Sequence, residues 1–276
     1  MNMAQVYLSS DQDEEMQAAI EKARKTFRYF WREMSWEHRR IVPGLDMSAV
    51  KAGFQDPPET AKRSGAAGVE QMWLSDIRCN GKEVIGRLLN SPNWLKSISE
   101  GDEATVPLKG ISDWMYVIQG RAYDGYTVNL LRSRMSKQER AEHDGAWGLD
   151  FGDPNEIKVV PDNWSGEKPK GFFARLFGGR PAPVDPNAEH PMAVNMGDSL
   201  KDFVKKDPSS LTSTDDDGLT MLHQLAMAGT VIGVKIFLEN GADPNAKTKN
   251  GMTALGLARA LGWKPVFDLL KQHGAS

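Results

Sequence analysis

Asp113 is the residue of this sequence best placed for acid–base chemistry. It lies in the apolar run 111–118, where a carboxylate on a strand would lose solvent and could serve as an acid or base. His38 and His143 are the imidazoles that could act with it, and together they would make the protein an enzyme. The structural alternative is that Asp113 accepts amide hydrogen bonds from the turn at 102–104 and that both histidines lie at solvated helix ends. We favour the structural interpretation and predict no catalytic residue.

Metal and cofactor chemistry has little support in the residue spacing. His38 and His143 have no third ligand at the spacing of a zinc site. Cys79 is the only cysteine, which excludes an intramolecular disulfide and a Cys-rich zinc centre. Gly178 and Gly179 have neither a strand before them nor a helix after them, unlike a phosphate-binding loop. We therefore predict no metal site and no cofactor.

The helices expected around these residues follow from apolar spacing and capping signals. Residues 11–35 carry apolar side chains three and four positions apart, which predicts an amphipathic helix opened by a capping box of Asp11 and Glu14. Shorter helices are expected over 91–101 and from Ser136 toward His143.

Two β-hairpins are expected between these helices. Asn80-Gly81 predicts a type I′ turn, in which Arg78 would face Glu83 and Trp73 would face Leu88. Gln119-Gly120 predicts a second hairpin. This order of elements indicates an α+β domain, an antiparallel sheet covered by the first long helix.

Composition narrows the class of protein further. The chain has 276 residues, 40% of them hydrophobic, and a net charge of −3 without a basic section, which argues against a nucleic-acid partner. The longest apolar run, 226–234, is too short for a transmembrane segment. The N-terminus lacks the features of a secretory signal, so a cytoplasmic location is expected.

A Pro- and Gly-rich stretch suggests how the chain is divided. We expect a domain over 1–160, a linker over 161–197 and a helical module over 198–276. Inside the linker, Phe172, Phe173 and Phe177 fall on one helical face between basic residues. They predict an apolar strap packed on the protein, with weak membrane contact or peptide docking as the alternatives.

An internal repeat is the strongest pattern in the sequence. Residues 217–223 recur as 250–256, offset by 33 positions, and the unit resembles the ankyrin repeat, a turn followed by two antiparallel helices. Thr220 and Thr253 are expected to cap the first helix of each unit. The resemblance assigns His223 a structural role. Two repeats and a capping helix over 198–208, with Leu200, Phe203 and Val204 turned inward, would form the C-terminal module.

Similarity to ankyrin repeats implies a protein-binding scaffold that presents its turn tips. One tip is acidic and the next is basic, and an exposed tryptophan after the last glycine turn would be a hot spot. A core position for this tryptophan is the alternative. The expected partner-binding residues are Asp215, Asp216, Lys247, Lys249, Asn250 and Trp263.

The N-terminal domain resembles a bacterial family of YegJ-like proteins without an assigned function. The resemblance is carried by the segments 23–27, 72–73, 85–90, 101–102, 111–115 and 125–127 and covers residues 12–155. It implies a fold and a bacterial origin, and no chemistry.

These patterns lead to one hypothesis and two rivals. The hypothesis is a cytoplasmic, non-enzymatic protein whose partner is another protein. A sharper version makes it an immunity protein, or antitoxin, that occludes a toxic enzyme. The rivals are an enzyme that uses Asp113 with His38 or His143, and a membrane-associated adaptor that uses the segment 172–177.

Overall fold

The computed structural model describes residues 13–64, 68–162 and 184–276. Contacts divide the chain into two compact units. The N-terminal unit holds residues up to 30 together with 40–158, and the C-terminal unit holds 31–39 together with 159–276. Residues 31–39 therefore pack with the C-terminal unit, a division that the expected boundary near residue 160 did not include. The phenylalanines of the segment 172–177 lie outside the described residues.

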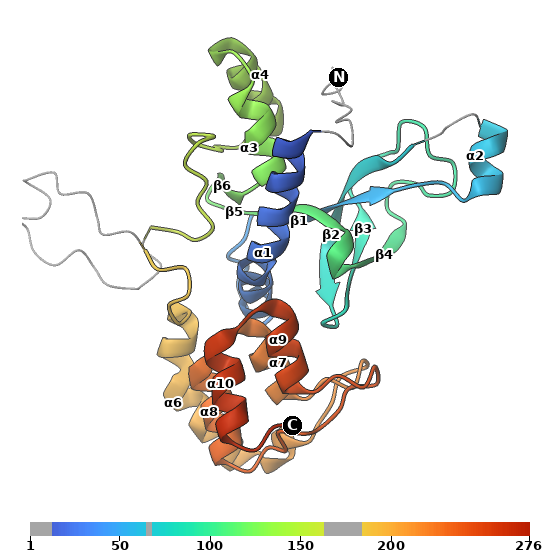
Figure 1. The fold of residues 1–276 in the computed structure, drawn as a ribbon. Helices are drawn as coiled ribbons and strands as arrows, with labels where there is room; N and C mark the ends of the chain where they lie inside the picture. Colours follow the sequence, from blue (N-terminus) through green and yellow to red (C-terminus); the bar gives the residue numbers. More distant parts are fainter. Residues whose placement is uncertain (1–12, 65–67, 163–183) are drawn as a thin grey trace, which may run out of the picture. The chain divides into compact units, whose positions relative to one another are not determined.

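A six-stranded antiparallel sheet forms the centre of the N-terminal unit (Figure 1). Its strand order is β4-β3-β2-β1-β5-β6. Within the sheet, β1 pairs with both β2 and β5. The strands are β1 Met47–Phe54, β2 Glu70–Cys79, β3 Glu83–Leu88, β4 Glu103–Pro107, β5 Ile111–Ile118 and β6 Arg121–Asp124.

The two faces of this sheet are covered by different elements. Helix α1, Glu14–Glu37, lies against β5, where the Trp114 indole Nε1 donates to the Ala23 carbonyl at 2.8 Å. On the other face, a buried cluster around Met115 includes Val128 of α3 and Phe151. Burial of nearly every residue of β5 follows from this two-sided covering. The expected α+β fold, with an antiparallel sheet covered by the first helix, is confirmed.

Helix α1 begins as its apolar spacing predicts, but a different residue caps it. The Asp13 carboxylate accepts the Met16 amide at 3.1 Å. Asp11 lies outside the described residues. The expected apolar stripe is the buried face, with Phe27 and Phe30 nearly inaccessible.

The first hairpin differs from its predicted register. Val84 pairs with Cys79 and Ile85 pairs with Arg78, so the turn is centred on Gly81 and Lys82. Only Gly81 of the loop has a positive φ, and the Asn80 side chain accepts the amides of Lys82 and Glu83. The Asn80 amide donates to the Glu83 carbonyl at 3.2 Å, so the tight turn is Gly81-Lys82 and the predicted type I′ turn at Asn80-Gly81 is wrong. The bonds of the Asn80 side chain stabilise the turn in this shifted position. An irregularity between Ser75 and Arg78 shifts the register again.

The second hairpin has the predicted turn. Gln119 and Gly120 both have positive φ, 50° and 74°, and Ile118 pairs with Arg121. This geometry is the one a tight two-residue turn requires.

Residues 91–101 form a loop rather than the expected short helix. The buried carboxylate of Glu70 accepts the amides of Asn93 and Trp94, and the Asp56 carboxylate accepts those of Lys96 and Ser97. Side chains from distant parts of the chain thus satisfy amides that would otherwise enter helical bonds. The helices of this unit, besides α1, are α2 Pro58–Ser64, η1 Leu108–Gly110, α3 Tyr126–Ser133 and α4 Lys137–Trp147.

The C-terminal unit is helical. Thr220 and Thr253 cap the first helix of each repeat, as predicted. The two repeats stack mainly through α7 and α9. The helices are α6 Pro191–Lys206, η2 Pro208–Leu211, α7 Met221–Ala228, α8 Val231–Glu239, α9 Ala254–Leu261 and α10 Lys264–Gln272. Within the described residues, no helix is long and apolar enough to cross a bilayer.

Helix α6 replaces the shorter capping helix expected from Asp198. It begins seven residues earlier in the chain, at Pro191, and His190 caps it by accepting the Met192 amide. Val204 is buried as expected, whereas Phe203 is 42% exposed, so its predicted inward orientation is wrong.

Candidate functional site

Asp113 is completely buried and caps helix α3 from a neighbouring strand. Its carboxylate accepts the backbone amides of Tyr126, Thr127 and Val128 at 2.8 to 3.3 Å and the Thr127 hydroxyl at 2.5 Å. These groups are the otherwise unpaired donors of the first helical turn. The partner amides were expected at 102–104 and instead come from α3, because β6 returns the chain to this end of β5.

Lys51 on β1 lies close enough to this carboxylate for its charge to matter. The Lys51 ammonium donates to the Thr127 hydroxyl at 3.3 Å and lies 5.6 Å from the centre of the Trp73 ring. Burial raises the pKa of Asp113, while the Lys51 charge and the Thr127 hydrogen bonds oppose that rise. Burial likewise lowers the pKa of Lys51. Asp113 and Lys51 therefore suit a structural role. The Asp113 carboxylate caps α3, and the positive charge of Lys51 offsets its negative charge.

Asp124 is a second buried carboxylate in this region, and it has far fewer donors. Its residue is 2% exposed, Oδ1 has no hydrogen-bond partner among the described residues, and the Thr26 hydroxyl is 3.5 Å from Oδ2. Burial, followed by the negative charge of Asp113, raises the pKa of Asp124 well above its usual value. Its φ of 68° is unusual for a residue other than glycine. Burial with few donors therefore favours the protonated form of Asp124.

The two histidines do not join Asp113. His38 belongs to the C-terminal unit, at the end of α1, with its ring 6.1 Å from that of Trp31. Partial burial and then the Arg39 charge lower the pKa of His38. His143 lies in α4, where its Nδ1 is 2.9 Å from a carboxylate oxygen of Asp144. The Asp113 carboxylate accepts from Trp114 and from the first turn of α3 and from neither imidazole, so these hydrogen bonds do not assemble the acid–base alternative.

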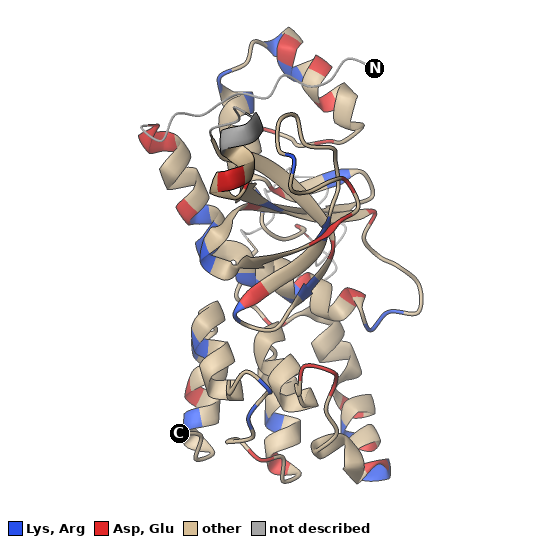
Figure 2. Cartoon of the chain, turned by 90° about the vertical axis from the view of Figure 1, so that its right-hand side faces the viewer, with Lys and Arg blue, Asp and Glu red and all other residues tan. Residues whose placement is uncertain are grey.

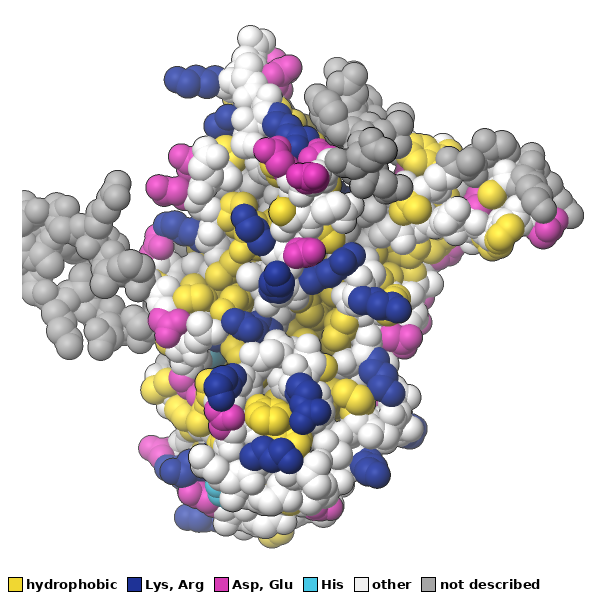
Figure 3. Space-filling model, in the orientation of Figure 1, with side chains coloured by type: hydrophobic (Ala, Val, Ile, Leu, Met, Phe, Trp, Pro, Cys, Tyr) yellow, Lys and Arg dark blue, Asp and Glu magenta, His cyan; other side chains and the backbone are white. Residues whose placement is uncertain are grey.

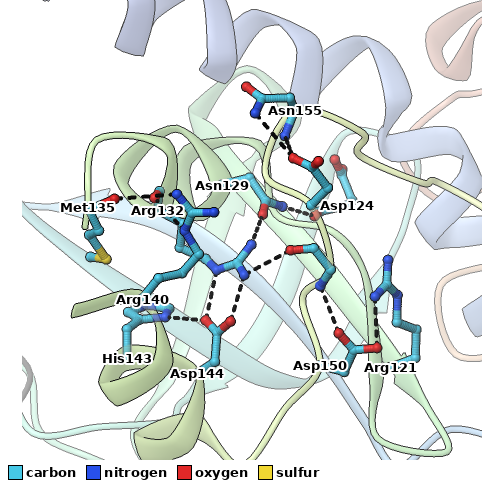
Figure 4. A network of polar contacts seen from close by, with 12 residues as sticks. Arg121, Asp124, Asn129, Arg132, Met135, Arg140, His143, Asp144, Asp150 and Asn155 are labelled. Carbon is cyan, nitrogen blue, oxygen red and sulfur yellow. Dashed lines mark hydrogen bonds and ion pairs between the residues drawn. The ribbon is translucent and has the colours of Figure 1, made fainter. Parts of the chain in front are cut away.

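Asp144 links His143 to a buried polar network around Arg132 (Figure 4). The Arg132 guanidinium, 1% exposed, donates to both Asp144 oxygens at 2.8 and 2.6 Å and to the Asn129 side chain at 2.6 Å. Its third contact is the Gly152 carbonyl at 3.0 Å. Arg132 therefore fastens α3 to α4 and to the segment that follows α4.

Sequence reasoning missed Arg132, Asn129 and Asp124 as parts of this polar core. Asn129 and Arg132 are three positions apart on α3 and so share one face, which was the available signal. The sequence signal for Asp124 was weaker: a carboxylate directly before a glycine at the end of a strand. Among the described residues, no group of three or more His, Cys, Asp or Glu side chains could hold a metal ion.

The expected partner-binding residues other than Trp263 lie on two neighbouring tip loops of the C-terminal unit. Figure 2 shows a run of acidic positions in one loop of this unit beside basic positions in the next. The Lys249 ammonium donates to the Asp216 carbonyl at 2.7 Å, and the Lys249 amide donates to the Asp217 carbonyl at 3.0 Å. The structure thus brings the acidic and basic tips together. Asp215, Asp216, Lys247, Lys249 and Asn250 are all exposed.

Two of the tip side chains differ in what they do. The Asp215 carboxylate accepts the amides of Asp217 and Leu219 and the Gln224 side chain, so it organises its own loop. Lys247, on the neighbouring loop, is exposed to solvent.

His223 performs the structural role expected from the resemblance. Its Nδ1 accepts the Thr220 amide at 3.0 Å, and Nε2 lies 2.9 Å from the Ala246 carbonyl. A ring that accepts at Nδ1 donates from Nε2 and is neutral. Burial lowers the pKa of His223, which favours this neutral form.

Trp263 is buried, so the predicted exposed hot spot is wrong. Only 3% of the residue is accessible, and its indole Nε1 donates to the Met227 carbonyl at 2.9 Å. Its ring fills space beside Gly229 of the preceding repeat, which is the alternative core position.

Comparisons with known proteins agree with both units. Residues 13–151 match a family described as an uncharacterized protein conserved in bacteria, DUF2314. The chain belongs to this bacterial family. Residues 217–249 of this DUF2314 protein match the ankyrin repeat. Both resemblances expected from the sequence are confirmed.

Relatives cover the chain to different extents. A protein of Neisseria meningitidis serogroup B whose name describes ankyrin repeats is 39% identical over 96% of each chain. The uncharacterized protein YegJ of Escherichia coli is 31% identical over 46% of this chain and 73% of its own. Zygote-specific protein 3 of Chlamydomonas reinhardtii is 42% identical over 25% of this chain and 18% of its own. The Neisseria protein therefore shares both units, while YegJ is similar to the N-terminal one.

Proposed function

We propose that this protein acts in the cytoplasm as a non-enzymatic binding protein that recognises another protein through its two tip loops. The ankyrin repeat implies protein–protein interaction. The observation that carries the proposal is the pairing of the exposed tips, in which Lys249 is bonded to two carbonyls of the acidic loop. A surface that is held rigid before binding loses less conformational freedom when a partner docks.

The arrangement in the N-terminal unit supports the same conclusion. The Asp113 carboxylate is occupied by donors of α3, and Arg132 is occupied by Asp144 and Asn129. These polar groups connect elements of the fold, which accounts for their burial without a reaction.

A sharper form of the proposal is an immunity protein that occludes a bacterial toxin. An acidic loop beside a basic one can match a partner whose surface carries both signs of charge, and such complementarity speeds association and rejects wrong partners. The test is to co-express this protein in a bacterial host with a toxin whose gene lies next to its own. Growth should be restored by the wild-type protein and not by a tip variant.

The binding role is tested by charge reversal at a tip. Lys247→Glu in the full-length protein should weaken capture of its specific partner from the source bacterium by about tenfold, because it places a repulsive charge on the binding surface. Quantitative mass spectrometry of affinity-purified complexes measures the loss.

The matched control is Lys235→Glu on helix α8. Lys235 is also exposed and makes a surface pair with Glu239 at 3.7 Å, so it carries the same change in charge away from the tips. If folded Lys247→Glu protein recovered every partner as well as the wild type does, recognition through the tips would be contradicted.

A further inference from the structure

Strand β4 is one edge of the six-stranded sheet, and within the described residues no strand pairs with its outer side. The opposite edge, β6, is covered by the chain that follows α4. There the Ala122 amide donates to the Asp150 carbonyl at 2.9 Å, and the Asp124 amide donates to the Lys158 carbonyl at 2.8 Å. In Figure 1, β4 lies at the end of the sheet away from α3 and α4. The fold therefore protects one edge of the sheet and leaves the other open.

The register of β4 shows which of its backbone groups point outward. The Leu88 amide donates to the Asp102 carbonyl at 2.9 Å, just before β4 begins, so the even-numbered residues of β4 bond to β3. Bonded and non-bonded pairs alternate in an antiparallel ladder. The amides of Glu103 and Thr105 therefore point away from β3, as do the carbonyls of Glu103, Thr105 and Pro107. Among the described residues, neither of these two amides has an acceptor.

The side chains of β4 protect this edge only in part. Proteins commonly block an exposed edge strand with a proline or a charged side chain. Pro107 removes one amide donor, but it is the last residue of the strand and leaves the centre open. The charge of Glu103 is paired with Arg78 at 2.5 Å. Thr105, between them, is exposed and belongs to a residue type that favours strand pairing.

A second copy of β4, running in the opposite direction, matches the open edge. With Thr105 opposite Thr105 across a twofold axis, each Thr105 amide meets the Thr105 carbonyl of the other copy. Each Glu103 amide then meets a Pro107 carbonyl. Opposite threonines are a favourable cross-strand pair. The two Glu103 carboxylates are kept about 13 Å apart by the length of strand from Glu103 to Pro107, so like charges do not face each other.

We propose that the protein forms a symmetric dimer in which the β4 strands of two copies pair antiparallel and join their two sheets. Figure 3 shows acidic, basic and hydrophobic side chains interspersed over the part of the N-terminal unit that holds β2, β3 and β4. A second copy therefore meets no surface of a single charge sign. The edge is short, so the dimer should be weak, with a Kd of roughly 10–100 µM. The dimer does not depend on recognition through the tip loops.

Analytical ultracentrifugation of the full-length protein, from about 1 µM to about 1 mM, measures the dimer. Thr105→Pro removes the central outward amide without removing a bond of the sheet, and it should weaken dimerisation at least about tenfold. Circular dichroism checks that this variant is folded. Thr105→Val is the matched control, because it retains the amide and the strand preference, and its dimerisation should stay within about twofold of the wild type. Lys247→Glu should also leave dimerisation unchanged, which separates failure at the edge from failure at the tips.

Cysteine crosslinking gives a second measurement that does not depend on the proline variant. Thr105→Cys should form a disulfide-linked dimer under mild oxidation, because opposite residues of paired strands lie within reach of a disulfide. Asp216→Cys, on a tip loop, should crosslink more slowly, and native Cys79 is buried. A wild-type protein that stays monomeric to about 1 mM would overturn the proposal. Wild-type dimerisation by folded Thr105→Pro, or equal crosslinking of the two cysteine variants, would overturn it as well.

Discussion

At the residue scale, two buried aspartates differ in the number of hydrogen-bond donors around their carboxylates. Asp113 accepts several amide and hydroxyl donors near Lys51, whereas Asp124 has one oxygen without a partner among the described residues. Donors directed at a carboxylate favour its charged form, and burial without donors favours the protonated form. The negative charge of Asp113 adds to the effect of burial in raising the pKa of Asp124.

Replacement of Asp124 by asparagine tests this assignment. The folded-state pKa of Asp124 is raised, so the folded protein holds a proton that the unfolded chain releases above about pH 4. The contribution of Asp124 to wild-type stability should therefore fall as pH rises from 4 toward its folded-state pKa. Asp124→Asn should reduce that slope by up to about 1.4 kcal/mol per pH unit.

Urea denaturation of both proteins between pH 4 and pH 8 measures the difference. Asparagine is the matched replacement, because it retains the shape of the side chain and tolerates the positive φ at this position. Asp216→Asn on the exposed tip serves as the control. Parallel pH profiles for wild type and Asp124→Asn would mean that Asp124 is not protonated in the fold.

At the element scale, each repeat depends on contacts that the next repeat completes. Trp263, at the start of α10, covers Gly229 at the end of α7, and His223 of α7 reaches the Ala246 carbonyl of the following tip loop. Two repeats bury little apolar surface by themselves, so such contacts carry a large share of their stability.

Trp263→Ala should therefore destabilise the repeat module strongly. It removes a buried ring and leaves the Met227 carbonyl without its indole donor, which together should cost about 3–5 kcal/mol. Hydrogen exchange of the α7 and α10 amides should accelerate accordingly. Phe267→Ala, at a half-buried ring of the same helix, is the comparison, and an equal or larger effect there would contradict the core role of Trp263.

At the scale of the whole molecule, helix α1 contributes residues to both units. Residues up to 30 pack on the sheet, and residues 31–39 belong with the repeats. In the C-terminal unit, the buried Glu33 carboxylate lies 3.1 Å from His190, and Arg39 donates to Gln224 of α7 at 3.2 Å. The first helix is thus also part of the ankyrin module's support.

A double-mutant cycle on Glu33 and His190 measures this support. Each of Glu33→Gln and His190→Ala should destabilise α6 by about 2 kcal/mol, because each disturbs a buried polar pair next to the start of that helix. The double variant should cost less than the sum of the two. Hydrogen exchange across Pro191–Lys206 provides the readout, and strict additivity would show that the pair is not coupled.

The sequence by itself determined the elements whose signals are local. The 33-residue repeat, the capping threonines, the amphipathic stripe of α1 and the turn at Gln119-Gly120 each depend on residues close together in the chain. Periodicity and capping are properties of short segments, so these elements could be predicted without knowledge of distant contacts.

Tertiary structure alone decided which distant groups meet. It tied the loop at 91–101 to Glu70 and Asp56, paired Asp113 with the first turn of α3, and buried Trp263 beside Gly229. In each case a polar group or a ring contacts a partner that is remote in sequence. These distant contacts override the conformation that the local sequence favours. Residue spacing carries no record of such partners, which is why the site residues were harder to predict than the helices.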